Sequence, residues 1–170
     1  MPALCPEGTM SNILNVPDSR SCPKCPKGYF CGSKGMTAVT VADKCDAGFI
    51  CILGSTVPDP RDGITGDFCP AGSYCDIGCG NVDDNPSCPF SCPDGTYNPL
   101  ESAKEAVSCL KCLPGSFCNG LNSASPAGLC EEGYWCPEGS KAGYKTELAA
   151  GPTDAGYYAP VGSDVQIPCS

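Results

Sequence analysis

Cysteine is the residue whose number and spacing give this chain its capacity for chemistry. Of 170 residues, 17 are cysteine and none is histidine. Two Cys-x-x-Cys pairs, "CPKC" (22–25) and "CLKC" (109–112), have the spacing of redox and zinc motifs. A thioredoxin-like motif needs a βαβ context, which is missing here, and a four-cysteine zinc site competes with structural disulfides. The wider cysteine pattern favours disulfides, so we expect no metal and no cofactor.

The lack of histidine also bears on catalysis. It removes the Ser–His and Cys–His arrangements that activate nucleophiles, and most catalytic metal sites. No nucleophile, base or oxyanion motif can be assembled, so we expect no enzyme and no catalytic residue. The acidic stretch "NVDDNPS" (81–87) could hold calcium through backbone oxygens, but its ligand spacing matches no known loop, which favours a solvated turn. The segment "PDPRDG" (58–63) is most simply a linker bounded by prolines.

The cysteines recur in a seven-residue phrase that must set their positions. The phrase has a cysteine at each end and a glycine in fourth place, and it reads "CPKGYFC" (25–31), "CDAGFIC" (45–51), "CPAGSYC" (69–75), "CLPGSFC" (112–118) and "CEEGYWC" (130–136). The glycine predicts a turn with positive φ, and the aromatic residues that follow it can lie over neighbouring sulfur. Each phrase could close on itself as a ring, or neighbouring phrases could interlock. Because the phrases come in twos, we favour interlocking.

The cysteine spacing indicates a larger tandem repeat. Six cysteines from Cys5 are separated by 17, 3, 6, 14 and 6 residues, and six from Cys92 by 17, 3, 6, 12 and 6. The repeats cover about 5–91 and 92–168. In the second, "TDAGYYA" (153–159) keeps the phrase but has Thr and Ala where the cysteines would be. All four cysteines of the auxiliary segment are lost together there, as closed pairs predict.

These spacings predict the domain organisation. We expect a six-cysteine module over 1–60, an auxiliary four-cysteine segment over 61–91, a second six-cysteine module over 92–140 and a cysteine-poor segment over 141–168. Residues 169–170 would begin a further repeat or form an intermolecular link.

Composition predicts the fold class, a small disulfide-rich protein built of elongated tandem cysteine-rich modules. The 21 glycines and 18 prolines disfavour long regular elements, and modules of this size need crosslinks to hold together. We therefore expect short β-ribbons and turns with little helix. A ribbon is expected at "TAVTV" (37–41), and the best helix candidate, "SAKEAVSC" (102–109), is short.

Charge and hydropathy exclude several partners. The net charge is −9, and the chain has no basic stripe of the kind that binds nucleic acid. No apolar run has the length of a membrane span, and no signal peptide opens the chain. This much cystine needs an oxidising compartment, so we expect an extracellular or cell-surface protein whose signal was removed or that is part of a longer chain. Any glycan would be O-linked, because "NPS" (85–87) is blocked by its proline.

The string "CPDGTYN…SCLKCLPGSFC…CEEGYWCPEGS" resembles the ephrin-receptor-like cysteine-rich repeat, which is similar in layout to tumour-necrosis-factor-receptor and growth-factor-receptor (EGF-like) modules. The resemblance covers most of 5–60 and 92–140. It implies the disulfides Cys5–Cys22, Cys25–Cys45, Cys31–Cys51, Cys92–Cys109, Cys112–Cys130 and Cys118–Cys136. For the auxiliary segment we expect Cys69–Cys79 and Cys75–Cys88, with other pairings open. Cys169 remains for a bond to another chain.

Such repeats are typical of large surface proteins, including those of protists. The favoured function is therefore a structural extracellular module, a protomer or fragment of a fibre such as a surface filament or flagellar hair. Its partners would be copies of itself, bound head to tail, or other surface proteins. The alternative is a receptor or adhesion ectodomain, which needs exposed anchors, and the candidates are Tyr144, Tyr157, Tyr158, Arg20 and Arg61. A cysteine-rich variant surface antigen shares the Cys-x-x-Cys pairs but not the phrases.

Overall fold

The structure is a computed structural model. It describes residues 4–14, 16–80, 88–120, 122–144 and 151–170. The candidate calcium stretch at 81–87 lies outside the described residues. The chain forms two compact units whose segments alternate along the sequence. The first unit comprises Met1–Cys69, Cys75–Phe90 and Ser102–Glu105, and the second comprises Pro70–Tyr74, Ser91–Glu101 and Ala106–Ser170.

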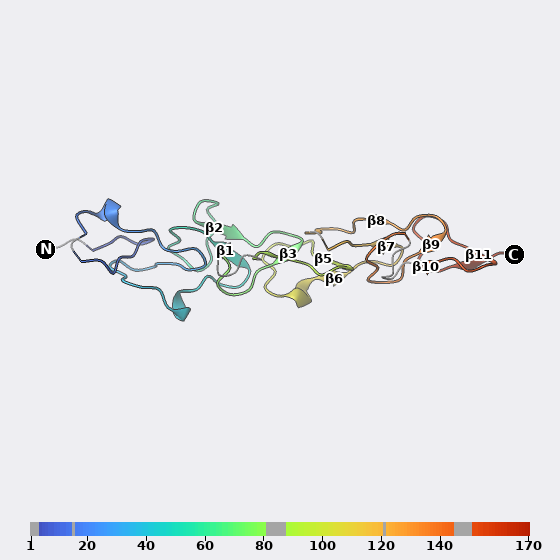
Figure 1. Ribbon diagram of the computed structural model, residues 1–170, viewed down its shortest axis with the longest axis horizontal. Helices are drawn as coiled ribbons and strands as arrows, with labels where there is room; N and C mark the ends of the chain where they lie inside the picture. Colours follow the sequence, from blue (N-terminus) through green and yellow to red (C-terminus); the bar gives the residue numbers. More distant parts are fainter. Residues whose placement is uncertain (1–3, 15, 81–87, 121, 145–150) are drawn as a thin grey trace. The chain divides into compact units, whose positions relative to one another are not determined.

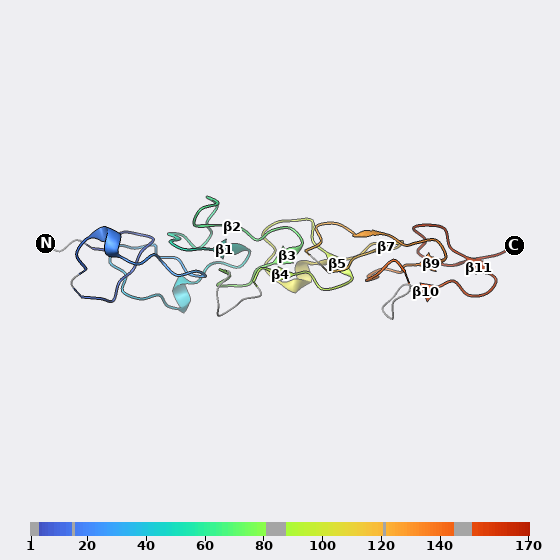
Figure 2. The same ribbon diagram turned by 45° about the horizontal axis from the view of Figure 1, so that its top comes forward.

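Regular structure consists of very short elements, drawn as small arrows and single helical turns in Figures 1 and 2. The 3-10 turns of the described chain are η1 (Ser19–Ser21), η2 (Val41–Asp43) and η3 (Ala106–Ser108). The two-stranded sheets are β1 (Phe49–Cys51) with β2 (Gly66–Phe68), β3 (Ser73–Tyr74) with β4 (Phe90–Ser91), β5 (Thr96–Tyr97) with β6 (Leu110–Lys111), β7 (Ser116–Phe117) with β8 (Gly128–Leu129), β9 (Tyr134–Trp135) with β10 (Gly151–Pro152), and β11 (Tyr157–Tyr158) with β12 (Ile167–Pro168). The predicted class of small disulfide-rich protein with short ribbons and little helix is confirmed.

The ribbons have a common origin in the sequence. The residue that follows each phrase glycine pairs, antiparallel, with the residue just before the next phrase. Thr96 pairs with Lys111 and Ser116 with Leu129 in this way, and Thr9 makes the same contact with Lys24 as an isolated bridge. Turns rich in glycine and proline interrupt the chain on both sides, which keeps each ribbon to two or three residues.

The buried core consists mainly of cysteine side chains. The buried hydrophobic residues of the described chain are 14 cysteines together with Ala103 and Ala159. One cluster joins Cys69, Cys75, Cys79 and Cys88, with Ile50 and Phe90 packed against it. A second cluster joins Cys130 and Cys136, with Phe117 and Tyr134 against it. Because larger apolar side chains lie partly or wholly in solvent, crosslinks carry the stability that a hydrophobic core supplies elsewhere.

Two local expectations are corrected by the structure. The stretch 37–41 forms no strand, because Thr40 instead caps η2. The Thr40 hydroxyl accepts from the Ala42 N–H at 3.2 Å, and the Asp43 carboxylate accepts from the Thr40 N–H at 2.7 Å. The helix candidate at 102–109 contains only the three residues of η3. Among the described residues, no helix has the length and apolar character needed to cross a membrane.

Candidate functional site

The interface between successive phrases is the best-defined candidate site. Among the described residues the phrase occurs eight times, because segments without both cysteines fold in the same way as the others. We number the phrases 1 to 8, and they cover 5–11, 25–31, 45–51, 69–75, 92–98, 112–118, 130–136 and 153–159.

Two backbone hydrogen bonds join each phrase to the next one. The N–H of the fourth-place glycine donates to the C=O of the seventh residue of the following phrase, and the C=O of that glycine accepts from the N–H of the first residue of the following phrase. We call this pattern the ladder. In the first unit, Gly8 N–H donates to Cys31 at 2.8 Å and Gly8 C=O accepts from Cys25 at 2.8 Å.

The ladder has the same form in the second unit. Gly95 N–H donates to Cys118 at 2.8 Å, and Gly95 C=O accepts from Cys112 at 2.8 Å. Phrase 8 takes part although it has no cysteine: Gly133 N–H donates to Ala159 at 2.8 Å and Gly133 C=O accepts from Thr153 at 3.0 Å. The ladder therefore depends on backbone geometry and does not need the sulfur atoms.

In phrases 1 to 6 the fourth-place glycine leaves no room for a side chain. At Gly115 φ is +78°, and a Cβ there would overlap the carbonyl oxygen of Gly162. At Gly8 φ is +77°, and a Cβ would lie 2.7 Å from the Gly54 carbonyl oxygen. A side chain at these places would be strained by the backbone conformation and would also clash with the turn that follows the phrase after next.

The disulfides of the phrases correct our expectation of interlocking pairs. Each cysteine pair closes its own phrase as a ring, so that the bridges are Cys25–Cys31, Cys45–Cys51, Cys69–Cys75, Cys112–Cys118 and Cys130–Cys136. The expected bridges Cys25–Cys45, Cys31–Cys51, Cys112–Cys130 and Cys118–Cys136 are therefore wrong. The physical reason is the glycine turn, which brings the two Cα atoms of a phrase to within 5.7 to 6.0 Å, the normal span of a cystine.

The predicted disulfide pairing of the auxiliary segment is corrected as well. Cys69 closes the ring with Cys75, and Cys79 bonds to Cys88, so the expected bridges Cys69–Cys79 and Cys75–Cys88 are wrong. The sulfur atoms of Cys75, Cys79 and Cys88 nevertheless lie within 4.8 Å of one another. Because all three belong to disulfides, this cluster offers no thiolate ligands to a metal.

The two longer bridges agree with the expectation. Cys5 bonds to Cys22 and Cys92 bonds to Cys109, each across 17 residues. The four sulfur atoms of the two Cys-x-x-Cys pairs thus lie in four separate disulfides, with Cys25 and Cys112 in rings.

Phrase 5 uses an amide where most phrases have their second cysteine. Asn98 is only 2% exposed, and its Nδ2 donates to the C=O of Ser73 at 3.2 Å and of Leu100 at 2.9 Å. Its Oδ1 accepts from the Leu100 N–H at 3.1 Å. A satisfied polar side chain therefore replaces sulfur in a buried position.

Cys169 is the free cysteine of the chain and is exposed. Its N–H donates to the C=O of Gly156 at 2.7 Å, which is the bond that the first residue of each later phrase makes with the preceding glycine. β12 also pairs Pro168 with Tyr157, in the register that places Lys111 opposite Thr96. Relative to phrase 8, Cys169 therefore occupies the position that the first residue of each later phrase takes relative to the phrase before it.

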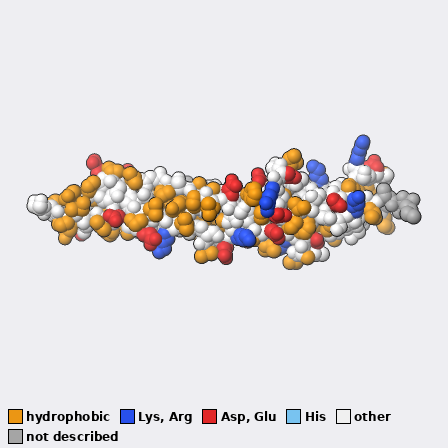
Figure 3. Space-filling view, turned by 180° about the vertical axis from the view of Figure 1, so that it is seen from behind, with side chains coloured by type: hydrophobic (Ala, Val, Ile, Leu, Met, Phe, Trp, Pro, Cys, Tyr) orange, Lys and Arg blue, Asp and Glu red, His pale blue; other side chains and the backbone are white. Residues whose placement is uncertain are grey.

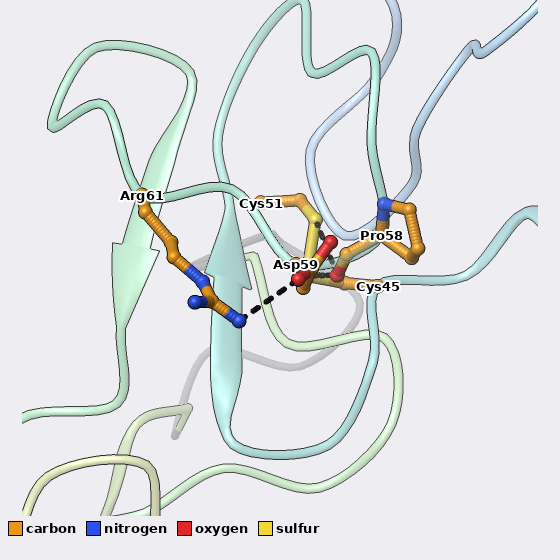
Figure 4. Close-up of polar contacts among 5 residues, drawn as sticks. All are labelled: Cys45, Cys51, Pro58, Asp59 and Arg61. Atoms are coloured by element: carbon orange, nitrogen blue, oxygen red, sulfur yellow. Dashed lines mark hydrogen bonds and ion pairs between the residues drawn. A yellow bond between two sulfur atoms is a disulfide. The ribbon is translucent and has the colours of Figure 1, made fainter.

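The segment at 58–63 is more structured than a plain linker. The guanidinium carbon of Arg61 lies 5.4 Å from the ring centres of both Phe49 and Phe68, and its Nη2 contacts Asp59 at 3.0 Å. Figure 4 shows this pair beside the Cys45–Cys51 disulfide. Arg61, one of the candidate anchors, thus makes contacts within its own loop while its side chain stays 58% exposed.

Asp62 organises the tip of the same loop. Its carboxylate accepts from the Ile64 N–H at 2.8 Å and the Thr65 N–H at 2.7 Å, and from the Thr65 hydroxyl at 2.8 Å. The bonds from Thr65 and Ile64 stabilise the charged form and lower the pKa of Asp62 to about 2.

On the face drawn in Figure 3, the acidic and basic side chains of the described residues form no continuous patch. In Figure 3, apolar side chains are scattered among acidic and basic ones on the face shown. The three tyrosines proposed as anchors are exposed, by 52% at Tyr144, 42% at Tyr157 and 49% at Tyr158.

No protein-family model matches this chain, and a search of curated proteins finds no match either. The eight disulfides suit an oxidising environment.

Proposed function

We propose that this chain is a structural extracellular or cell-surface module, a protomer or fragment of a fibre such as a surface filament or flagellar hair, with no catalytic step. The ladder is the observation that carries the proposal. Each phrase presents donors and acceptors to the next phrase in one constant arrangement, and this arrangement tolerates different side chains because it uses the backbone. The resemblance to ephrin-receptor-like repeats of surface proteins supports the same assignment.

The ladder is a heterologous interface, since the groups that face the preceding phrase differ from those that face the following one. A heterologous contact that does not close into a ring extends into a filament. We propose that copies of the chain associate head to tail through this kind of contact and that Cys169 forms a covalent bond to a neighbouring protomer. O-linked glycans and other surface proteins are further proposed partners.

Electrophoresis and sedimentation of the protein secreted under oxidising conditions test this proposal. We expect a series of bands on non-reducing gels that collapses to 17.4 kDa on reduction, with mass spectrometry identifying a bridge at Cys169. The Cys169→Ser variant should lose the covalent bands but still sediment as an oligomer at high concentration. A wild-type chain that stays monomeric in sedimentation at every concentration would contradict the proposal.

A receptor or adhesion ectodomain is the second candidate, and the exposed tyrosines favour it. Tyr157 and Tyr158 lie on β11 in phrase 8, and two exposed apolar side chains, Val161 and Val165, follow in the segment after that phrase. Tyrosine is enriched among residues that dominate binding energy. A monomer whose saturable binding to a protein ligand is lost in Tyr157→Ala and Tyr158→Ala variants would support this second function over the first.

A further inference from the structure

The auxiliary segment brings together a group of cysteine sulfur atoms that the proposed function does not use. The Sγ atoms of Cys75, Cys79 and Cys88 lie within 4.8 Å of one another, and Cys69 joins them through its bridge to Cys75. In the described chain, no other three cysteine or carboxylate side chains meet in this way. All four cysteines belong to the first unit. We call them the four-cysteine cluster.

The spacing of these sulfur atoms is close to that of a tetrahedral metal site. Four thiolates around Zn²⁺, each with a Zn–S bond near 2.3 Å, lie about 3.8 Å from one another. The separations among Cys75, Cys79 and Cys88 exceed that value by at most about 1 Å, which side-chain rotation can close. In the oxidised chain each sulfur is bonded to another sulfur and is not a thiolate. A metal ion can therefore bind only after both bridges are reduced.

Backbone hydrogen bonds hold three of the four cysteines in place without using sulfur. The Cys69 N–H donates to the Gly48 C=O at 2.9 Å, and the Gly48 N–H donates to the Cys75 C=O at 2.8 Å, as the ladder requires. The Cys79 C=O accepts from the Cys51 N–H at 2.9 Å. Phrase 8 makes its ladder bonds with no cysteine at all. We therefore expect these backbone positions to persist when the bridges are reduced, which leaves the thiols gathered at one place.

The surroundings of the cluster also suit a metal ion. None of the four cysteines is more than 2% exposed, and the side chains of Ile50 and Phe90 pack against them. Thiolate charges in such a buried place are costly unless a cation neutralises them. An apolar shell also limits the access of water to the metal. Thiolate ligands in a tetrahedral arrangement favour soft ions of the Zn²⁺ type over Mg²⁺ or Ca²⁺.

We propose that the four-cysteine cluster of the reduced chain is a binding site for one soft metal ion, Zn²⁺ or its analogue Cd²⁺. Two molecules of a small dithiol break the two S–S bonds, give two electrons and two protons to each, and become disulfides themselves. The metal ion then takes the four sulfur atoms as thiolates and releases four protons. The metal site and the pair of disulfides are thus alternative states of the same residues. This inference is independent of the proposed function, which concerns the oxidised chain.

Cadmium binding to the full chain tests the proposal. The chain is reduced with an excess of dithiol, freed of the dithiol without oxygen, and mixed with one equivalent of Cd²⁺. We expect the ultraviolet absorption of cadmium–thiolate bonds and a release of protons. Alkylation followed by peptide mass spectrometry should then find Cys69, Cys75, Cys79 and Cys88 protected and the remaining cysteines modified.

Two matched variants, each lacking one pair of bonded cysteines, provide the controls. The paired replacement of Cys79 and Cys88 by serine removes two ligands, so Cd²⁺ should pass to a competing carboxylate chelator that leaves the wild-type site loaded. The paired replacement of Cys112 and Cys118 by serine removes a ring outside the cluster and should leave metal binding unchanged.

Three results would overturn the proposal. The first is protection of the two Cys-x-x-Cys pairs, 22–25 and 109–112, in place of the cluster. The second is equal alkylation of all cysteines in the presence of Cd²⁺, which is also the result that a chain unfolded by reduction would give. The third is equal retention of Cd²⁺ by the two serine variants.

Discussion

Gly115 faces the backbone of Gly162 so closely that a methyl group on Gly115 would overlap the Gly162 carbonyl oxygen. Gly133 occupies the same fourth place in the next phrase with nearly the same φ, +81° against +78°, but nothing lies within 4 Å of a Cβ built on it. Comparing the two glycines therefore separates the effect of the left-handed backbone conformation, which both share, from the effect of a close neighbour, which only Gly115 has.

Replacing each glycine by alanine should reveal this difference. Gly133→Ala should cost about 1–2 kcal/mol of unfolding free energy, because only the left-handed conformation is penalised. Gly115→Ala should cost about 1–3 kcal/mol more, because the turn at Gly162 must also move away. Denaturant unfolding of the oxidised chains measures both values. Equal losses in the two variants would show that the close approach to Gly162 is not required.

The Asp62 carboxylate predicts a pH dependence of the 58–65 loop. Its pKa is lowered from 3.8 to about 2, so the hydrogen bonds from Ile64 and Thr65 are fully present above about pH 4 and are lost as the pH falls through 2. The NMR shift of the Thr65 amide should follow this transition with a midpoint near pH 2. Asp62→Asn should remove the transition, whereas Asp67→Asn, which removes a nearby carboxylate on β2, should leave it unchanged. A Thr65 midpoint close to pH 4 would contradict the assignment.

Peptide mapping of the oxidised chain tests the ring connectivity. Cleavage should leave phrases 25–31 and 112–118 as self-closed loops. Loop-closure entropy assigns about 2.4 kcal/mol to such a seven-residue ring and about 3.2 kcal/mol to an 18-residue loop. The paired replacement of Cys112 and Cys118 by serine should therefore destabilise the chain less than the same replacement of Cys92 and Cys109. Peptides linking Cys112 to Cys130 would restore the interlocking scheme.

Partial reduction should affect one cluster differently from the rings elsewhere. Cys75, Cys79 and Cys88 have sulfur atoms within 4.8 Å of one another, so a thiolate formed at one of them lies close to the neighbouring disulfide. Exchange products that link Cys75 to Cys79 or Cys88 are expected on limited treatment with a small thiol. Equivalent exchange between the rings at 112–118 and 130–136 of the second unit, whose sulfur atoms form no such cluster, is not expected.

The sequence was sufficient to predict a fold of short ribbons held by disulfides, but it was not sufficient to predict which cysteines of the phrases pair. Cysteine, glycine and proline content predicted short ribbons held by disulfides, and the glycine of each phrase indicated the positive-φ turn. Pairing was missed because cysteine spacing does not show whether the two cysteines of a phrase point toward each other. That depends on how tightly Gly28 or Gly115 turns the chain. We predicted that 25–31 and 45–51 are joined by disulfides because the two phrases are neighbours in the sequence, but neighbouring phrases need not share a disulfide.

A shorter period within the two predicted repeats was hidden by the side chains. Emphasis on the 17, 3, 6 spacing led to two long repeats, whereas the ladder repeats at every phrase. Ser11 and Asn98 occupy the seventh place, which cysteine holds in other phrases, so a search for pairs of cysteines passes over phrases 1 and 5. The shared signal was the glycine in fourth place, Gly8 and Gly95 in these two phrases. Backbone bonds such as Gly95 to Cys118 leave no further mark on the sequence.

Adding a disulfide to phrase 8 tests whether the ladder alone sets the geometry of a phrase. Thr153 and Ala159 take the first and seventh places, and both make the ladder bonds with Gly133 that cysteines make in other phrases. If these bonds alone set the ring geometry, the double variant Thr153→Cys with Ala159→Cys should form a new disulfide without reshaping the backbone. The new ring should raise the unfolding free energy by about 2 kcal/mol.

Thiol counting should then find one free cysteine, Cys169, as in the wild type, and mass spectrometry should show a closed loop at 153–159. The single variant Ala159→Cys is the control, because it adds a buried thiol at the same place without a partner and should not stabilise the chain. Formation of a bond from residue 159 to Cys169 instead of residue 153 would mean that the glycine turn of phrase 8 does not bring its first and seventh residues together. In that case the ladder would depend on the disulfides and would not be able to direct them.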